Sequence, residues 1–212
     1  MQPLTLDHVA LYVADRERMA ATAIDRLGLR VIEQTDLFTL LGADARRGKL
    51  TLFDAAGPRE RGALGRIGLR VSSLDGREPS VDLGEGLEVV LVEVETSSEL
   101  DLDHVLLLAK DPVAAARGWE RLGFTPVGDG RLEVGGAYLE LTPGDPGQPE
   151  RPLLNHIGVL VDSVDEHQAE AVELGVEIDD LVDAPNTLAL FVWGPDRVKL
   201  EYVEHKPSFS LT

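Results

Sequence analysis

Leu6-Asp7-His8-Val9 is the first of three similar tetrapeptides, and it recurs as Leu102-Asp103-His104-Val105 and as Leu154-Asn155-His156-Ile157. Each tetrapeptide opens an apolar run typical of a β-strand, and a stretch of helical character follows it. Each helical stretch ends at a glycine, the usual residue after a helix C-terminus; these are Gly28, Gly123 and Gly175. Because the spacing from histidine to glycine is nearly constant, the sequence predicts a chain built from repeats.

The repeated unit is predicted to be βαβββ. The copy that begins at Leu102 is the third, because a degenerate second copy precedes it. In this copy, Asp111-Pro112 provides an N-cap and a first helical residue. Glycine turns then separate three short strands at 124–127, 132–134 and 137–141. The fourth copy follows the same plan, with Ser163 and Glu166 in a capping-box pattern. The first copy spans residues 4–54. The fold class is therefore α+β.

A degenerate second copy lies between residues 64 and 93. Its opening strand carries Arg66 where the other copies carry histidine, and glycine, proline and aspartate replace most of its helix. The polar stretch 96–101 is the predicted linker. We therefore expect four modules in two pairs, each pair a curved, open mixed sheet around a cleft: an amino-terminal pair at 1–98 and a carboxy-terminal pair at 99–212.

The composition limits the classes of binding partner and the cellular compartment that are expected for this chain. The net charge of −18 opposes nucleic-acid binding, which needs cationic groups. The absence of cysteine excludes disulfides and thiolate ligands and suits a reducing compartment. No apolar run reaches membrane-spanning length, and no secretory signal is recognisable. We expect a cytoplasmic protein whose partner is a small-molecule substrate. Nucleic acid and membrane partners are not expected, and a homo-oligomer is left open.

Histidines and glutamates in apolar strands suggest a metal site. Burying a charged group is costly unless the group is paired or binds a metal. If the third and fourth copies pack as a pair, His104, Glu140, His156 and Glu201 meet in their cleft. Imidazole and carboxylate donors without sulfur suit one divalent ion, which could be Zn²⁺, Ni²⁺, Co²⁺, Mn²⁺ or Fe²⁺.

With these features the chain resembles the vicinal oxygen chelate superfamily of glyoxalases, bleomycin-resistance proteins and type I extradiol dioxygenases. The resemblance implies metal ligands at His104, Glu140, His156 and Glu201 for a glyoxalase, or at His104, His156 and Glu201 for an extradiol enzyme. Two positions depart from the family pattern. The last turn reads Gly194-Pro195-Asp196-Arg197, and Phe191 stands nearest the tyrosine position of the extradiol enzymes.

The matching positions of the amino-terminal pair are His8, Thr51 or a neighbour, Arg66 and Glu88, so its metal site is predicted to be degenerate. His8 is interpreted as a structural relic of the repeat, and Arg66 as a partner for Glu88. The remaining histidines, His167 and His205, are interpreted as a solvated helix residue and a tail residue.

Three classes of function fit this sequence. The first is a metal-dependent lyase or isomerase of glyoxalase type, acting on a small oxygenated substrate, with Glu201 or Glu140 as general base. The second is an extradiol ring-cleaving dioxygenase with two histidines, one carboxylate and open positions. The third is a binding protein without chemistry. Glu140 favours the first class, because a fourth protein ligand would fill a position that oxygen chemistry needs open.

Overall fold

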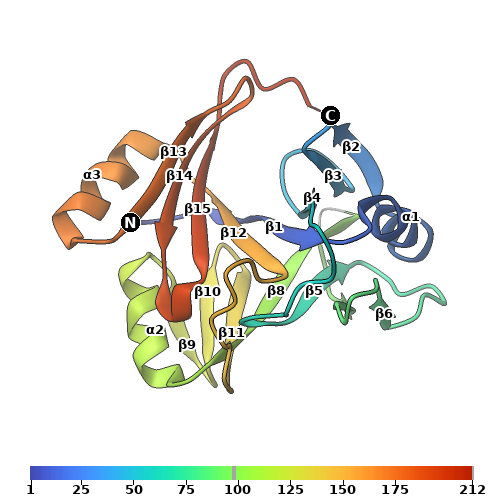
Figure 1. The fold of residues 1–212 in the computed structure, drawn as a ribbon, viewed down its shortest axis with the longest axis horizontal. Coiled ribbons are helices and arrows are strands. Elements are labelled where there is room, and N and C mark those ends of the chain that lie inside the picture. Colours follow the sequence, from blue (N-terminus) through green and yellow to red (C-terminus); the bar gives the residue numbers. More distant parts are fainter. Residues whose placement is uncertain (97–98, 212) are drawn as a thin grey trace.

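The computed structural model describes residues 1–96 and 99–211, and it contains two mixed β-sheets, one above the other in Figure 1. The upper sheet has eight strands in the order β13-β14-β15-β12-β1-β4-β3-β2, and the lower sheet has seven in the order β6-β7-β5-β8-β11-β10-β9. Three α-helices flank these sheets within the described residues. The α+β architecture of paired βαβββ modules is confirmed.

The eight-stranded sheet joins the first and fourth modules. Its central pair, β1 and β12, is antiparallel, and the closing strands β4 and β15 run parallel to their opening strands. The strand bounds are β1 Thr5–Val13, β2 Arg30–Gln34, β3 Phe38–Gly42, β4 Lys49–Asp54, β12 Leu154–Leu160, β13 Ile178–Asp183, β14 Thr187–Trp193 and β15 Lys199–His205.

The seven-stranded sheet joins the second and third modules by the same scheme. Its central pair is β5 and β8, flanked by the parallel closing strands β7 and β11. Between Val71 and Glu88 the chain forms only the short strand β6 and no helix, so the degenerate second module is confirmed. The bounds are β5 Leu64–Val71, β6 Ser80–Asp82, β7 Glu88–Glu93, β8 Leu100–Ala109, β9 Thr125–Gly128, β10 Arg131–Val134 and β11 Ala137–Pro143.

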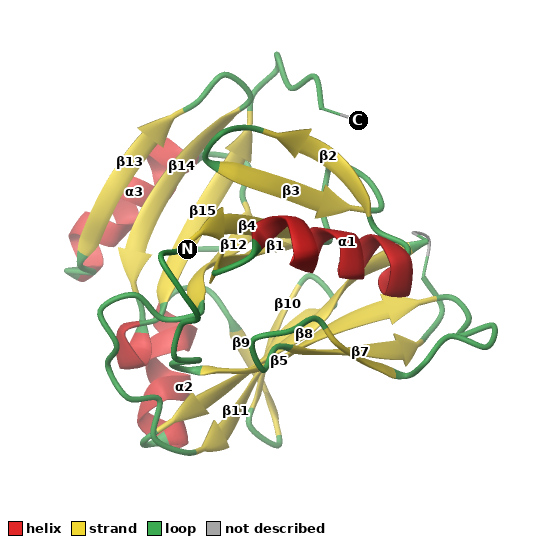
Figure 2. Cartoon of the chain, turned by 45° about the vertical axis from the view of Figure 1, so that its right-hand side comes forward, coloured by secondary structure: helices red, strands yellow, loops and turns green. Residues whose placement is uncertain are grey.

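Each helix begins and ends where its capping residues predict. Helix α1 spans Arg16–Leu27, α2 spans Pro112–Arg121 and α3 spans Val164–Leu174. The N-caps are Asp15, Asp111 and Ser163, each of which accepts a backbone N–H bond with its side chain. Helix α1 packs on β2, β3 and β4, α2 covers β8 to β11, and α3 covers β14 and β15 (Figures 1 and 2).

The pairing of modules corrects the expectation from the sequence. Neighbouring modules do not share a sheet: the first pairs with the fourth, and the second pairs with the third. The expected division between residues 98 and 99 therefore does not separate the two sheets, because each sheet takes strands from both sides of it. Of the predicted linker 96–101, residues 97–98 lie outside the described residues, and Leu100 already belongs to β8. A fragment of residues 1–98 would lack the central partner of both its opening strands.

Side-chain size agrees with this choice of partner. Leu106 of β8 lies against Gly65 of β5, where an added Cβ would come within 2.0 Å of the leucine Cδ2. The residue of β12 that corresponds to Gly65 is Asn155, and beside β8 its side chain would occupy the space that Leu106 fills. On β1 the residue matching Leu106 is the smaller Ala10, which lies opposite His156. Close packing therefore favours β8 beside β5 and β1 beside β12.

The two sheets meet through a mainly aliphatic core with a few large aromatic residues. Trp119 of α2 and Phe124 are buried in edge-to-face contact, with ring centroids 5.4 Å apart. Tyr202 of β15 is buried, and its hydroxyl donates a 2.8 Å hydrogen bond to the carbonyl of Leu122 at the end of α2, joining the third and fourth modules. Among the described residues, no helix is long and apolar enough to cross a bilayer.

Candidate metal centre

Three side chains from three adjacent strands converge on the inner face of the eight-stranded sheet: His8 of β1, His156 of β12 and Glu201 of β15. His8 Nε2 lies 2.8 Å from Glu201 Oε2, and His156 Nε2 lies 2.9 Å from the same oxygen. The two Nε2 atoms are 2.9 Å apart. All three residues are buried, so the strands place three metal-type donor atoms at one point inside the protein.

The residue before each histidine orients its ring. Asp7 Oδ2 lies 2.8 Å from His8 Nδ1, and Asn155 Oδ1 lies 3.2 Å from His156 Nδ1. Metal-binding histidines commonly use one ring nitrogen for such a bond and the other for the ion. The Asp-His and Asn-His pairs of the repeated tetrapeptide therefore direct both Nε2 atoms to the common point.

The donor spacing fits a divalent ion. Nitrogen and oxygen ligands lie about 2.1 Å from such ions, so ligands at right angles are about 3.0 Å from one another. The observed separations of 2.8 to 2.9 Å are close to this value. Two imidazoles and one carboxylate on adjacent strands thus form one face of a coordination shell and leave the opposite positions to other ligands.

Electrostatics also favour a cation at this point. Burial alone would lower the pKa of His8, but the charges of Glu201 and Asp7 outweigh burial and raise this pKa to about 9. Burial alone would raise the pKa of Glu201, yet the two imidazoles hold it below its usual range. Burial lowers the pKa of His156. Glu201 is therefore an anion at neutral pH, and metal binding would release the proton of His8.

Thr51 occupies the fourth position of the site. Glu201 pairs with Gly158, two residues after His156, and Thr51 of β4 pairs with Ala10, two residues after His8. Thr51 and Glu201 are thus equivalent in the two paired modules, and Thr51 is buried. The site accordingly has three strong protein donors, with a hydroxyl where a second carboxylate would stand.

The expected ligands His104 and Glu140 lie in the other sheet, which corrects their assignment to this centre. Arg66 Nε is 3.3 Å from His104 Nε2, and an Arg66 guanidinium nitrogen is 3.6 Å from Glu140 Oε2. Arg66 therefore contacts Glu140 rather than Glu88, whose carboxylate accepts a hydrogen bond from Ser80. The third module shares its sheet with the second module and not with the fourth. In the lower sheet, the Arg66 guanidinium therefore occupies the place that corresponds to the proposed ion in the upper sheet.

The structure replaces His104 with His8, which the sequence reasoning had set aside as a relic. The sequence does mark His8 as a candidate ligand, because His8 stands in the same tetrapeptide as His104. Two further histidines also differ from expectation. His167 is buried rather than solvated, with its ring 4.9 Å from that of Tyr202. His205 ends β15 rather than lying in a tail, and its Nε2 is 3.5 Å from Asp7 Oδ1.

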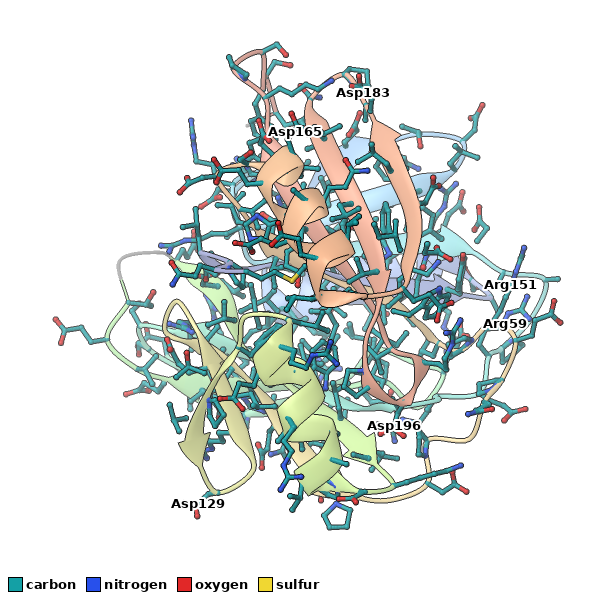
Figure 3. All side chains as sticks on the ribbon, turned by 90° about the vertical axis from the view of Figure 1, so that its left-hand side faces the viewer. Arg59, Asp129, Arg151, Asp165, Asp183 and Asp196 are labelled. Atoms are coloured by element: carbon teal, nitrogen blue, oxygen red, sulfur yellow. The ribbon has the colours of Figure 1, made fainter. Side chains whose placement is uncertain are left out.

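Aromatic rings adjoin the centre, and a cavity lies next to residues that contact these rings. Phe191 and Phe53 flank His156, with ring centroids 5.2 and 6.4 Å from its own. A cavity of about 490 Å³ has Tyr12, Trp193, Asn155 and Lys199 on its wall, and the Tyr12 ring lies 6.0 Å from that of Phe53. Residues 146–152 and Asp196 also line it, and Figure 3 labels Arg151 and Asp196 in the right-hand half of the view. The cavity thus reaches neighbours of the centre, whereas His8, His156 and Glu201 do not line it.

We predict that Gly158→Ala weakens metal binding. A Cβ at Gly158 would lie 2.3 Å from the His8 ring, so the ring must move away from the donor cluster. The matched control is Gly68→Ala, whose Cβ would lie 2.3 Å from the His104 ring in the other sheet. Overpacking typically costs about 1–3 kcal/mol of stability, and we expect this cost in both variants. Only Gly158→Ala should lower the metal affinity in a chelator-competition titration; equal affinities would contradict the placement of His8.

Comparisons with known proteins agree with this architecture. Residues 101–202 match the model of the Glyoxalase/Bleomycin resistance protein/Dioxygenase superfamily. A comparison with curated protein sequences finds no match.

Similar solved structures cover nearly the whole chain. A candidate dioxygenase from Bacillus subtilis superposes with a TM-score of 0.75 at 16% identity, covering 98% of this chain and 87% of its own. A mutant of glyoxalase I from Zea mays gives 0.72 at 16% identity, covering 94% and 93%. The cppA protein from Streptococcus pneumoniae gives 0.65 at 14% identity, covering 96% and 98%. At these identities the likeness concerns the fold. The chain thus has the vicinal oxygen chelate fold, and residues 101–202 carry the sequence pattern of the glyoxalase, bleomycin-resistance protein and dioxygenase superfamily.

Proposed function

We propose that the protein is a divalent-metal enzyme whose ion is held by His8, His156 and Glu201, and that it cleaves the ring of a catechol-type substrate with O₂. The observation that carries this proposal is the three-donor set with Thr51 at the fourth position. Two histidines and one carboxylate with open positions are the ligand set of non-haem Fe²⁺ oxygenases. The carboxylate that favoured a lyase or isomerase, Glu140, lies in the other sheet and does not fill this position.

When bound, the ion would supply a Lewis-acid centre that two adjacent oxygens of a substrate can chelate. His8 and His156 would bind it through Nε2, while Asp7 and Asn155 keep both rings oriented through Nδ1. Glu201 offsets part of the positive charge of the ion. In the overall reaction, one ring C–C bond breaks and both oxygen atoms of O₂ enter the ring-opened product.

The rings beside the centre support a planar, aromatic substrate. Phe53 and Phe191 provide apolar surface beside His156 and exclude water from that side. Lys199, the first residue of β15, lines the cavity, with its Nζ 4.7 Å from the centroid of the Trp193 ring. The charge of Lys199 is paired, because its Nζ lies 2.6 Å from Asp179 Oδ2.

Oxygen uptake tests the proposal. The metal-free protein is reconstituted with Fe²⁺ under anaerobic conditions, mixed with a panel of catechols, and followed with an oxygen electrode and by the absorbance of a yellow ring-opened product. We expect uptake with at least one catechol, loss of uptake in Glu201→Gln, and retention in Glu140→Gln. No uptake, together with anaerobic turnover of a hemithioacetal by the Zn²⁺ or Ni²⁺ form, would instead assign a glyoxalase-type lyase or isomerase. Absence of stoichiometric metal in the loaded protein would leave a binding protein.

A further inference from the structure

Asp7 differs from the other residues that orient a histidine of the repeats. The residue is only 1% exposed, and its carboxylate contacts His8 Nδ1 through Oδ2 at 2.8 Å. Its second oxygen, Oδ1, is 2.9 Å from Lys49 Nζ. Asn155, which orients His156, is an uncharged amide. At the centre, His8 therefore has a carboxylate as its Nδ1 partner, whereas His156 has an uncharged amide.

Lys49 is a buried cation with fixed partners. It is 4% exposed, and its Nζ donates to the carbonyl of Ala45 at 2.9 Å as well as to Asp7. His205 Nε2, at 3.5 Å, is the other side-chain group near Asp7 Oδ1 among the described residues. A charge buried this deeply is stable only when it is paired and hydrogen-bonded. Lys49 thus allows Asp7 to remain an anion next to His8.

The lower sheet contains the same local bond with a more distant cation. Asp103 Oδ2 lies 2.7 Å from His104 Nδ1, and its other oxygen has Arg70 Nε at 3.8 Å, compared with 2.9 Å for Lys49 at Asp7. His104 Nε2 faces Arg66 instead of a second imidazole. The chain therefore holds a matched pair of Asp-His units, one at the candidate centre and one away from it.

We infer that Asp7, held by Lys49, is a positioning residue that keeps the Nδ1–H of His8 directed at its carboxylate and the Nε2 lone pair directed at the metal. This inference rests on the proposed metal centre. An anionic partner makes an imidazole a stronger donor than an amide partner does, so His8 becomes the stronger of the two histidine ligands. Replacing partners of this kind typically weakens metal binding about 10–100-fold.

The test compares Asp7→Asn with Asp103→Asn in the full-length protein. Both changes keep size and shape and remove one charge beside a histidine. Co²⁺ affinity is measured by chelator competition, and the visible absorption of bound Co²⁺ reports the ligand geometry. We expect Asp7→Asn to bind Co²⁺ about 10–100-fold more weakly with an altered spectrum. Asp103→Asn should match the unmodified protein in both measurements.

Each outcome separates this inference from the proposed function. If the unmodified protein binds no Co²⁺, the metal centre itself is wrong. If it binds Co²⁺ and Asp7→Asn binds equally well with the same spectrum, only the positioning role is wrong, even if that variant melts at a lower temperature. Should Asp7→Asn fail to fold, the double variant Asp7→Asn/Lys49→Met, which leaves no lone buried charge, provides the same comparison.

Discussion

His8→Ala is expected to abolish metal binding, whereas His104→Ala leaves it intact. The reason is the arrangement of the strands: β1 places His8 Nε2 2.8 Å from Glu201, while β8 places His104 against Arg66. Removing one of three donors leaves two ligands for the ion, and the buried carboxylate of Glu201 loses a partner. Metal content of the purified, reconstituted variants, measured by elemental analysis, provides the readout.

Thermal unfolding gives an independent measure of the same prediction. Binding to the folded state at a metal concentration of 100 times Kd stabilises a protein by about 2.7 kcal/mol. We expect a chelator to lower the melting temperature of the unmodified protein and of His104→Ala, but not that of His8→Ala. Metal bound stoichiometrically by His8→Ala and lost from His104→Ala would contradict the structure and restore the pairing of neighbouring modules.

Arg66→His is expected to create a second metal site, raising the metal content from one to two equivalents. Arg66, His104 and Glu140 occupy in the lower sheet the module positions that His8, His156 and Glu201 occupy in the upper sheet. Asp103 already bonds to His104 Nδ1, so the oriented imidazole and a carboxylate are in place. The substitution removes the competing guanidinium and adds the missing imidazole donor.

Arg66→Gln is the control, because it removes the same positive charge without adding an imidazole. We expect it to keep one metal equivalent. A titration with Co²⁺, followed by visible absorption, separates the two variants. A single equivalent in a folded Arg66→His protein would show that the lower sheet lacks the geometry of the upper one and would argue against the equivalence of the two sheets.

The features that the sequence by itself determined depend on contacts between residues close together in the chain. The helix bounds depend on Asp15, Asp111 and Ser163 as N-caps and on the glycines that follow, which are contacts between near neighbours in the chain. The Asp-His and Asn-His pairs are equally local, since adjacent residues make the bond. The chemistry of the centre, with imidazole and carboxylate donors on apolar strands, was likewise visible in residue types. His156 and Glu201 were identified in this way.

The tertiary structure alone decided which modules meet. The opening strands are so alike that either histidine, His8 or His104, could face His156, and the glycine that makes room for a histidine ring is present in both sheets, as Gly68 and Gly158. The choice involves residues far apart in sequence, and the contacts of Leu106 with Gly65 and of Ala10 with His156 agree with it. Through that choice the third donor became His8 and the fourth position became Thr51, because strand pairing, rather than the repeat itself, determines which side chains share a cavity.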